Sequence, residues 1–186
     1  MELKDNRPSP PISITPYQLS DWHILWELRD FQLAESGIIV PPEDKFPAQP
    51  LDVGRDDYEW DYHHIAEIYL SDAGGFWLAW WENEPAGHIG AQDLGGVVEL
   101  RRMYIRAEYR RRGIASRLVR ALLDHCKTRS IAAVELWTRE DGVGRKLYER
   151  IGFKTTDRPG KEFVNLNYRT NFTPGNDEIR MRFDLA

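Results

Sequence analysis

Eight arginine side chains lie within twenty residues of this 186-residue chain, around a single glycine, Gly113. Their positions are Arg101, Arg102, Arg106, Arg110, Arg111, Arg112, Arg117 and Arg120. Like charges at this density repel one another unless an anion or a carboxylate lies between them. The cluster therefore predicts a site that holds a negatively charged group.

The sequence around Gly113 has the pattern of a strand that turns sharply into a helix. Residues 97–105 are predicted as a strand, and apolar residues recur every four positions from Ile114 to Cys126, which is typical of a helix. The start of a helix presents unpaired backbone N–H groups and the positive end of the helix dipole, and together these bind phosphate. Arginine side chains add charge-assisted hydrogen bonds to phosphate oxygens.

The kind of phosphate ligand can be narrowed by exclusion. The chain has neither the G-x-x-x-x-G-K-[ST] loop of nucleotide triphosphatases nor the G-x-G-x-x-G fingerprint of dinucleotide-binding proteins. Residues 1–100 carry 5 Lys/Arg and 19 Asp/Glu, whereas residues 101–186 carry 20 and 11. Because the acidic first half opposes a polyanion, we expect no nucleic-acid partner. Simple attraction between the two halves would also explain the asymmetry.

A change of phase interrupts the strand predicted over residues 97–105. Val98 and Leu100 share one parity, whereas Met103 and Ile105 share the other. A β-bulge produces this change and leaves backbone groups unpaired, often beside an active site. Two arginine side chains at an exposed sheet edge would be the alternative explanation.

Apolar periodicity predicts the other elements in an order typical of a mixed sheet flanked by helices. Helices are expected at residues 21–33, 57–70 and 142–152, strands at 12–15, 132–138, 153–156 and 178–185, a hairpin at 75–94 with its turn at 82–87, and a proline-rich loop at 38–55. The segment 157–177 is expected to be a loop, with a strand at 163–168 as an alternative. We expect a loose tail at residues 1–11 and one domain at 12–186.

The single cysteine and the lack of long apolar runs bear on the cellular setting. The first residues lack the apolar run of a signal peptide, and no run approaches the roughly 20 apolar residues that span a bilayer. Cys126 cannot form an internal disulfide and falls on the apolar face of a predicted helix, which favours a core thiol over a nucleophile. We expect a cytoplasmic protein with no membrane partner.

The segment RRRGIA, residues 110–115, matches the R/Q-x-x-G-x-G/A signature of the GNAT superfamily of N-acetyltransferases. The longer stretch ELRRMYIRAEYRRRGIASRLV resembles the family's fourth strand and signature loop, and LYERIGF, residues 147–153, resembles its closing helix. The likeness covers residues 12–186 in element order and residues 97–153 closely. It implies an α/β (α+β) fold with a mixed, mostly antiparallel central sheet flanked by helices, and acetyl-CoA as co-substrate.

The resemblance also implies which residues hold acetyl-CoA. In the family, the fourth strand splays from the next one, and its backbone N–H groups, here near Met103, Tyr104 and Ile105, bind the pantetheine arm and the acetyl carbonyl. This favours the bulge over the edge-strand explanation, because unpaired donors can stabilise an oxyanion. The pyrophosphate would be bound by the backbone N–H groups of Arg111, Arg112, Gly113, Ile114, Ala115 and Ser116, and by the side chains of Arg110 and Arg112.

Three further side chains acquire expected roles from the same resemblance. Tyr148 would lie near the CoA sulfur and donate a proton, its alternative role being to pack the helix onto the sheet. Glu99 would be the general base, directly or through water, or else would pair with a neighbouring arginine. Asp141 stands where many relatives have an asparagine that contacts the pantetheine arm, and capping of the closing helix is its alternative role.

The activity implied is N-acetylation of the primary amine of a small molecule, by direct attack in a ternary complex. Acetylation of a protein N-terminus or lysine, or a non-catalytic CoA-binding module, are the alternatives. Acidic and aromatic residues on the expected acceptor side suit a cationic amine, although a solvated acidic loop would look the same. These residues are Asp52, Asp56, Asp57, Tyr58, Glu59, Trp60, Asp61 and Tyr62.

Histidines and oligomeric state complete the expectations. Adjacent His63 and His64 point to different sides of a helix, so we expect no metal site. His88, in a predicted strand, is expected to be a packed core residue. The oligomeric state stays open between a monomer and a homodimer.

Overall fold

The structure, a computed structural model, describes residues 12–42, 50–54, 57, 59–157 and 177–185. The expected tail at residues 1–11 and the alternative strand at residues 163–168 lie outside the described residues. Within the described ranges, no helix combines the length and the apolar character needed to cross a bilayer.

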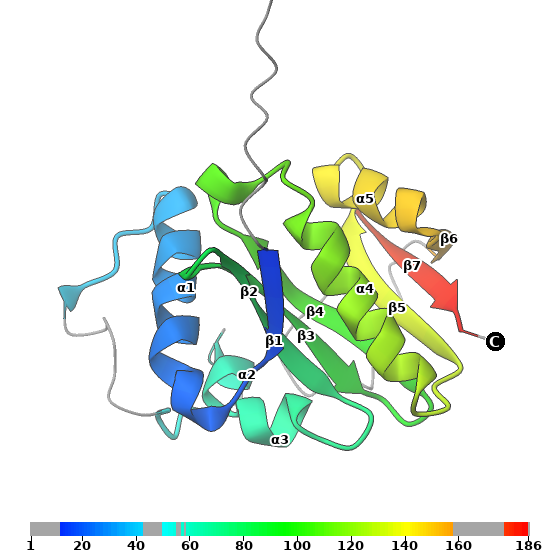
Figure 1. Cartoon of the computed structure of the whole chain (residues 1–186), viewed down its shortest axis with the longest axis horizontal. Coiled ribbons are helices and arrows are strands. Elements are labelled where there is room, and N and C mark those ends of the chain that lie inside the picture. Colours follow the sequence, from blue (N-terminus) through cyan, green and yellow to red (C-terminus); the bar gives the residue numbers. More distant parts are fainter. Residues whose placement is uncertain (1–11, 43–49, 55–56, 58, 158–176, 186) are drawn as a thin grey trace, which may run out of the picture.

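A seven-stranded sheet forms the centre of the fold, in the order β1-β2-β3-β4-β5-β7-β6 (Figure 1). Only the pair β4 and β5 is parallel, so the expected mixed, mostly antiparallel sheet is confirmed. The strands are β1 (Ile12–Pro16), β2 (Gly75–Trp81), β3 (Glu84–Asp93), β4 (Val97–Ile105), β5 (Ala133–Arg139), β6 (Lys154–Asp157) and β7 (Glu178–Asp184).

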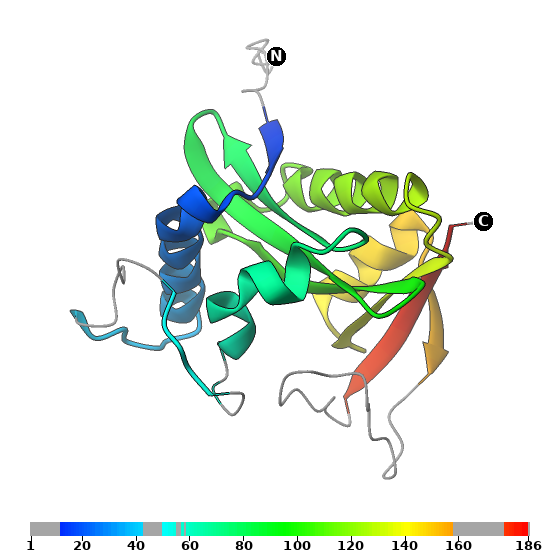
Figure 2. The same ribbon diagram turned by 90° about the horizontal axis from the view of Figure 1, so that it is seen from below.

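Helices cover both faces of the sheet, and an apolar cluster lies between the helices and the sheet on each face (Figure 2). On one face, Leu118 and Leu122 of α4 and Tyr148 of α5 are buried against the strands. On the other face, Trp26 of α1 and Tyr62 of α2 are buried together with neighbouring rings. The helices are α1 (Trp22–Glu35), α2 (Trp60–His63), α3 (Ile65–Tyr69), α4 (Ile114–Lys127) and α5 (Val143–Ile151), with short 3₁₀ turns η1 (Leu19–Asp21) and η3 (Ala107–Tyr109).

Two sequence-based boundaries were wrong. The helix expected over residues 57–70 is two short helices that meet at His64, whose backbone leaves the helical region with φ −110° and ψ 33°. The His64 imidazole Nδ1 lies 2.8 Å from the carbonyl oxygen of Trp60, so the side chain competes for a helical acceptor. The hairpin turn expected at residues 82–87 is shorter, since β2 ends at Trp81 and β3 begins at Glu84.

The change of phase in β4 is a β-bulge, and the edge-strand alternative is wrong because β4 lies inside the sheet. The β3–β4 register shifts between His88 and Gly90, and Arg102 has a positive φ of 50°. As a result Leu100 and Ile105, which have opposite parity, are both buried in the cluster beneath α4. The bulge turns Arg102 toward the α1–α3 face.

Candidate active site

The parallel strands β4 and β5 separate soon after they begin. Their pairing runs only from Val97 opposite Ala133 to Glu99 opposite Glu135, although β4 continues to Ile105. Beyond Glu99, the edge of β4 that faces β5 has no strand partner among the described residues. The two strands therefore open into a gap, as the resemblance implied.

Strand alternation decides which amides of β4 face this gap. The Arg106 N–H donates to the carbonyl oxygen of Ala86 in a 3.0 Å bond, so Arg106 and Ala86 form a hydrogen-bonded pair of the antiparallel ladder. Such pairs recur at every second residue, which turns the backbone of Tyr104 toward β3 and that of Met103 and Ile105 toward the gap. Met103 and Ile105 therefore supply the open N–H groups.

Tyr104 differs from its sequence-based expectation. Its backbone pairs with His88 of β3, and its hydroxyl donates to Glu35 Oε1 at 2.8 Å on the α1 side. Burial, and then the bond to Glu35, raise the pKa of the Tyr104 phenol. Of the three expected β4 positions, Met103 and Ile105 fit a ligand in the gap and Tyr104 does not.

The turn before α4 presents a row of unpaired amides. Arg111 and Gly113 both have left-handed backbones, with φ 61° and 85°, and Gly113 is the N-cap of α4 without a side-chain cap bond. Within the described ranges, none of the backbone N–H groups from residue 111 to residue 116 donates a hydrogen bond. Added to the helix dipole, these groups form an anion site. The set comprises Arg111, Arg112, Gly113, Ile114, Ala115 and Ser116.

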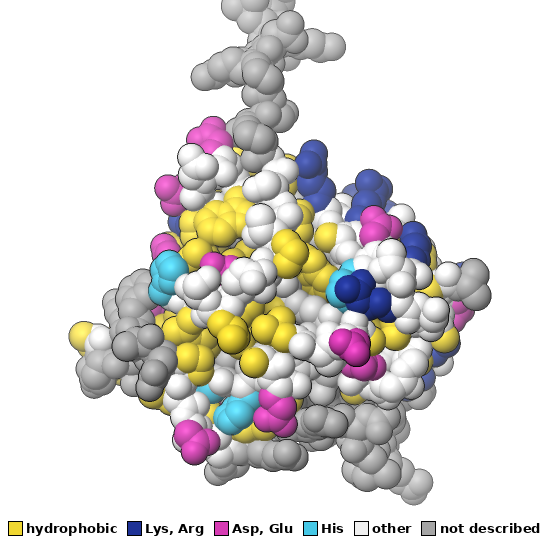
Figure 3. Space-filling model, turned by 60° about the horizontal axis from the view of Figure 1, so that its bottom comes forward, with side chains coloured by type: hydrophobic (Ala, Val, Ile, Leu, Met, Phe, Trp, Pro, Cys, Tyr) yellow, Lys and Arg dark blue, Asp and Glu magenta, His cyan; other side chains and the backbone are white. Residues whose placement is uncertain are grey.

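Carboxylates neutralise only part of the arginine cluster. Arg102 pairs with Asp61, and Arg110 pairs with Glu35. Four exposed arginines, at the turn or in the first two turns of α4, have no carboxylate partner among the described residues: Arg111, Arg112, Arg117 and Arg120. Most Lys and Arg side chains visible in Figure 3 lie on its right-hand side, toward α4. These four charges add to the positive end of the helix dipole beside the unpaired amides.

The two expected phosphate-binding side chains have different surroundings. Besides its pair with Glu35, Arg110 donates through Nε to the carbonyl oxygen of Ile105 at 2.9 Å. The Arg112 guanidinium lies over the ring of Trp81, 4.4 Å from its centroid, which leaves its N–H edges available. Arg112 is thus the better placed of the two to bind a phosphate.

Tyr148 is the buried member of α5. Its ring packs edge-to-face on Phe153 at 5.6 Å and belongs to the cluster beneath α4. No described residue hydrogen-bonds to its hydroxyl. Burial raises the pKa of the Tyr148 phenol, so the hydroxyl keeps its proton at neutral pH.

Glu99 and Asp141 take contrasting positions. Glu99 is buried at the last β4–β5 pair, where the gap begins, and its Oε1 lies 3.8 Å from Arg101 Nε. Asp141 is exposed in the turn between β5 and α5, where it pairs with Arg139 at 3.3 Å. Gly142, not Asp141, is the N-cap of α5, so the helix-capping alternative for Asp141 is wrong.

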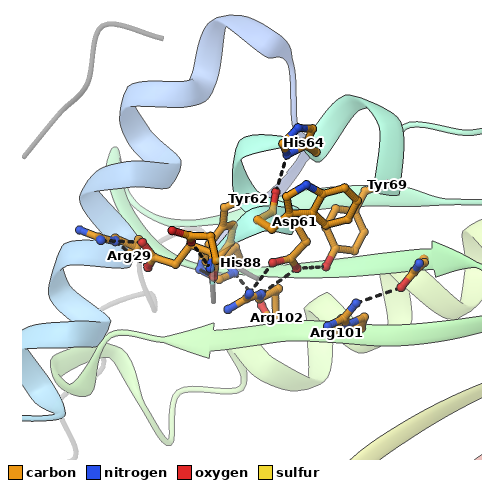
Figure 4. A network of polar contacts seen from close by, with 12 residues as sticks. Arg29, Asp61, Tyr62, His64, Tyr69, His88, Arg101 and Arg102 are labelled. Atoms are coloured by element: carbon orange, nitrogen blue, oxygen red, sulfur yellow. Dashed lines mark hydrogen bonds and ion pairs between the residues drawn. The ribbon is translucent and has the colours of Figure 1, made fainter. Parts of the chain in front are cut away.

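A buried polar network lies under the β4 bulge, and sequence reasoning missed it (Figure 4). Arg102 Nε donates to Asp61 Oδ2 at 2.8 Å, and a second guanidinium nitrogen binds Oδ1. The Tyr69 hydroxyl donates to Asp61 Oδ2 at 2.5 Å, and the Arg102 guanidinium lies 4.3 Å from the Tyr62 ring centroid. Burial alone would raise the pKa of Asp61, but the bonds and charge of Arg102 outweigh it and lower that pKa.

His88 joins this network as a neutral core residue, as expected. Its Nδ1 lies 2.6 Å from the carbonyl oxygen of Arg102, and its Nε2 lies 3.3 Å from the Tyr62 hydroxyl. Burial lowers the pKa of His88 to about 3. A neutral imidazole carries one proton, and since a carbonyl oxygen can only accept, that proton is on Nδ1.

Cys126 is also a buried core thiol, as expected, and burial raises its pKa to about 11.

The acidic stretch expected to attract a cationic amine is largely neutralised. Asp61 is fully buried against Arg102, and Glu59 binds Arg29 through both carboxylate oxygens, at 2.7 and 2.6 Å. The rings of Trp60 and Tyr62 are buried. Asp52 and Asp57 are exposed, whereas Asp56 and Tyr58 lie outside the described residues. The expectation of a cation site here is therefore wrong for Glu59 and Asp61.

A groove of about 530 Å³ lies along α1 on the same side of the sheet. Its described lining combines two carboxylates with apolar side chains: Glu27, Asp30, Phe31, Ala34, Gly37, Ile38, Ile39 and Val40. Phe31 connects the groove to the end of β4, because the Arg106 guanidinium lies 3.9 Å from its ring centroid. Asp30 Oδ1 accepts from Arg29 at 2.8 Å, whereas its Oδ2 is buried there without a hydrogen-bond partner among the described residues.

Comparison with solved structures identifies relatives of this fold. An acetyltransferase of the GNAT family from Staphylococcus aureus superposes with a TM-score of 0.67 at 23% identity, covering 95% of this chain and 100% of that one. The PaiA N-acetyltransferase of Thermoplasma acidophilum, solved in complex with coenzyme A, superposes with a TM-score of 0.62 at 18% identity, covering 94% and 99%.

Curated relatives match a shorter stretch. The N-acetylaspartate synthetase of Xenopus tropicalis is 35% identical over 98 residues, 50% of this chain and 36% of that protein. Human N-acetyltransferase 8 is 32% identical over 104 residues, 52% and 46% respectively. The chain thus spans less than half the length of these two relatives. The model of the acetyltransferase (GNAT) family matches residues 26–153, well over half of the chain, and together with the splayed strands and the amide-lined turn this shows that the chain belongs to the GNAT family.

Proposed function

We propose that this protein is an acetyl-CoA-dependent N-acetyltransferase that acetylates the primary amine of a small molecule. The observation that carries the proposal is the row of amides from residue 111 to residue 116, which donate to no described residue and are flanked by arginines without a carboxylate partner in the described part of the chain. Such a turn suits the pyrophosphate of acetyl-CoA, and the adjoining gap between β4 and β5 suits an extended pantetheine arm. The coenzyme A complex of the PaiA N-acetyltransferase gives family support.

The chemistry requires an uncharged amine, a polarised carbonyl and a proton for the departing thiolate. The amides of Met103 and Ile105 would bind the acetyl oxygen and stabilise its negative charge as the amine nitrogen adds to the carbonyl carbon. Glu99 would accept the amine proton, directly or through water. Tyr148 would donate its hydroxyl proton to the sulfur as the carbon–sulfur bond breaks, and no covalent enzyme intermediate is required. In this scheme Asp141 lies at the turn that borders the pantetheine arm.

The acceptor would approach along the α1 groove. Its apolar lining, and Asp30 Oδ2, which has no hydrogen-bond partner among the described residues, support a partly apolar amine. Neutralisation of Glu59 and Asp61 removes most of the earlier support for a strongly cationic acceptor. Asp30→Asn should raise the KM for the amine severalfold and leave the Kd for acetyl-CoA unchanged.

Thiol release from acetyl-CoA, assayed with a panel of small amines and peptides, tests the activity. Release with a small amine supports the proposal, and release with peptides alone favours acetylation of proteins. Calorimetric binding of CoA without release for every acceptor favours a non-catalytic module. Absence of any heat of binding with CoA or acetyl-CoA would overturn the proposal.

We also propose the remaining sequence-based assignments, namely a single domain over residues 12–186 and a cytoplasmic location. Two apolar clusters on the faces of one sheet support the single domain. The buried, unpaired Cys126 supports a reducing compartment.

A further inference from the structure

We propose that Asp61 of α2 is a positioning residue for acyl transfer, because it clamps Arg102 and so holds the β4 bulge that directs the amides of Met103 and Ile105 into the gap. The effect of Asp61 on acyl transfer rests on the proposed function. The clamp itself concerns the free protein and can be tested without substrate.

The bulge needs an external constraint. Arg102 has φ 50°, a left-handed conformation that costs a non-glycine residue energy and that persists only where the surroundings enforce it. It lies at the point where the β3–β4 register shifts. Without a constraint, β4 could relax toward regular pairing with β3, which would reverse the parity of every residue that follows.

The constraint acts on both ends of Arg102. Asp61 binds two nitrogens of the guanidinium, and the face of that group lies 4.3 Å from the Tyr62 ring centroid. At the backbone, His88 Nδ1 lies 2.6 Å from the Arg102 carbonyl oxygen. Asp61 is fully buried and is itself held by the Tyr69 hydroxyl at 2.5 Å. The side chain and the carbonyl of one strained residue are therefore fixed from two different elements, α2 and β3.

The geometry links this clamp to the reaction. Met103 follows Arg102 directly, and Ile105 is the next residue whose backbone turns toward the gap. A shift of about 1 Å in an oxyanion donor can cost about a hundredfold in rate. The amides from residue 111 to residue 116 belong to another element, so binding of the pyrophosphate should depend little on Asp61.

Asp61→Asn, which keeps the shape but loses the charge, is the test variant. Glu135→Gln is the matched control, since Glu135 is a largely buried carboxylate that accepts from Arg182 at 2.7 Å in the neighbouring strand pair β5–β7, away from the bulge. In the free protein, the ¹⁵N–¹H cross-peaks of Met103 and Ile105 should shift or double in Asp61→Asn but not in Glu135→Gln. The Ile114 cross-peak should stay in place in both.

Single-turnover acetyl transfer is the second readout. Asp61→Asn should lower the rate by about 10- to 100-fold, with the Kd for acetyl-CoA within about threefold of wild type. Glu135→Gln should change neither by more than about threefold. Unmoved β4 cross-peaks, or moved cross-peaks with a wild-type rate, would overturn the inference. If the wild-type protein transfers no acetyl group at all, the proposed function fails, and the cross-peaks still decide whether Asp61 sets the bulge.

A second pair of variants keeps the inference testable if Asp61→Asn does not fold. The His88→Asn side-chain amide can replace the Nδ1–H donor to the Arg102 carbonyl, whereas His88→Leu cannot. Transfer by His88→Leu should be slowed at least tenfold, and His88→Asn should recover most of that loss. Equal rates for the two variants would show that the carbonyl of Arg102 needs no such support.

Discussion

Arg110 ion-pairs with Glu35, the last residue of α1, across a sequence separation of 75 residues. Its Nε also donates to the Ile105 carbonyl oxygen, so two of its five N–H donors, and the ion pair with Glu35, hold the guanidinium within the protein. Arg112 has no such partner among the described residues and lies over Trp81. The two arginines of the signature therefore have different tasks. Arg110 fastens α1 to the end of β4, and Arg112 is the one available to a phosphate.

This difference predicts unequal effects on coenzyme affinity. Arg112→Gln should weaken CoA binding about tenfold, since hydrogen bonds to charged groups contribute roughly 1.5–3 kcal/mol and tenfold corresponds to about 1.4 kcal/mol. Arg110→Gln should change the affinity by less than about threefold but lower the melting temperature. Titration calorimetry at two salt concentrations measures both affinities. A larger loss in Arg110→Gln would mean that Arg110 leaves Glu35 when the coenzyme binds.

Gly113 is required for its backbone conformation and not for space. At φ 85° it lies in the left-handed region, and no heavy atom of the described residues lies within 4 Å of where a Cβ would stand. Gly95 offers a matched control, with φ 83° and equally open surroundings, in the turn before β4. Both Gly113→Ala and Gly95→Ala should cost about 1–2 kcal/mol in the free energy of unfolding.

Only Gly113→Ala should also weaken CoA binding, because strain there disturbs the amides of the turn. Urea unfolding gives the stabilities and calorimetry gives the affinities. Equal affinities in the two variants would argue against this turn as the coenzyme site.

Local sequence patterns predicted the elements that carry the candidate site. The parity change before Met103 identified the bulge, and the four-residue apolar repeat after Gly113 identified α4. Both signals are local, since they depend on which face of one strand or helix is buried. They were sufficient to locate the amide-lined turn.

Side-chain pairings were not predictable in the same way. Asp61 and Arg102 are 41 residues apart in sequence, and the residues next to each of them in the sequence do not indicate that the two pair. Asp61 therefore looked like one member of a solvated acidic stretch. The division of the expected helix into α2 and α3 at His64 could not be predicted either, because it depends on the contact between the His64 imidazole and the Trp60 carbonyl oxygen. The arginine cluster did predict that anions or carboxylates lie between its side chains, but it did not predict which carboxylates these are.

Tyr148→Phe should slow the chemical step more than it weakens coenzyme binding. Burial holds the Tyr148 phenol protonated, so it can donate to the leaving thiolate, and general acids contribute about 100- to 10,000-fold. We expect a single-turnover rate at least tenfold lower with the Kd for CoA within about threefold. Tyr17→Phe is the control, because Tyr17 is also buried and its hydroxyl has no partner within the described ranges. Single-turnover kinetics unchanged by Tyr148→Phe would remove this residue from the acid role.

Glu99→Gln should depress the rate most at low pH. Free amines are scarce there, so a base that accepts the ammonium proton matters most. Glu135→Gln is the comparison, since Glu135 lies directly opposite Glu99 in the last β4–β5 pair. The pH dependence of kcat/KM from pH 6 to 9 measures the effect. A profile parallel to that of wild type would leave Glu99 with a structural role, beside Arg101.

His88 should make the stability of the fold depend on pH. Burial lowers its pKa from 6.5 to about 3, although the bond to the Arg102 carbonyl opposes this shift. Below pH 6.5 the unfolded chain therefore binds more protons than the folded one, and stability falls by up to about 1.4 kcal/mol per pH unit until about pH 3. The lowered pKa of Asp61 has its effect only below the ordinary value of 3.8.

His88→Asn removes this titration while it keeps a donor for the Arg102 carbonyl. At pH 7.5 wild type should be the more stable protein, because the variant loses part of the ring packing against Phe76 and Tyr104. At pH 5 the difference should narrow by about 2 kcal/mol, since only wild type carries the histidine penalty. Urea unfolding at the two pH values measures the change. A constant difference would mean that His88 binds protons equally in the folded and unfolded states, and therefore that the ring is not held neutral beneath the bulge.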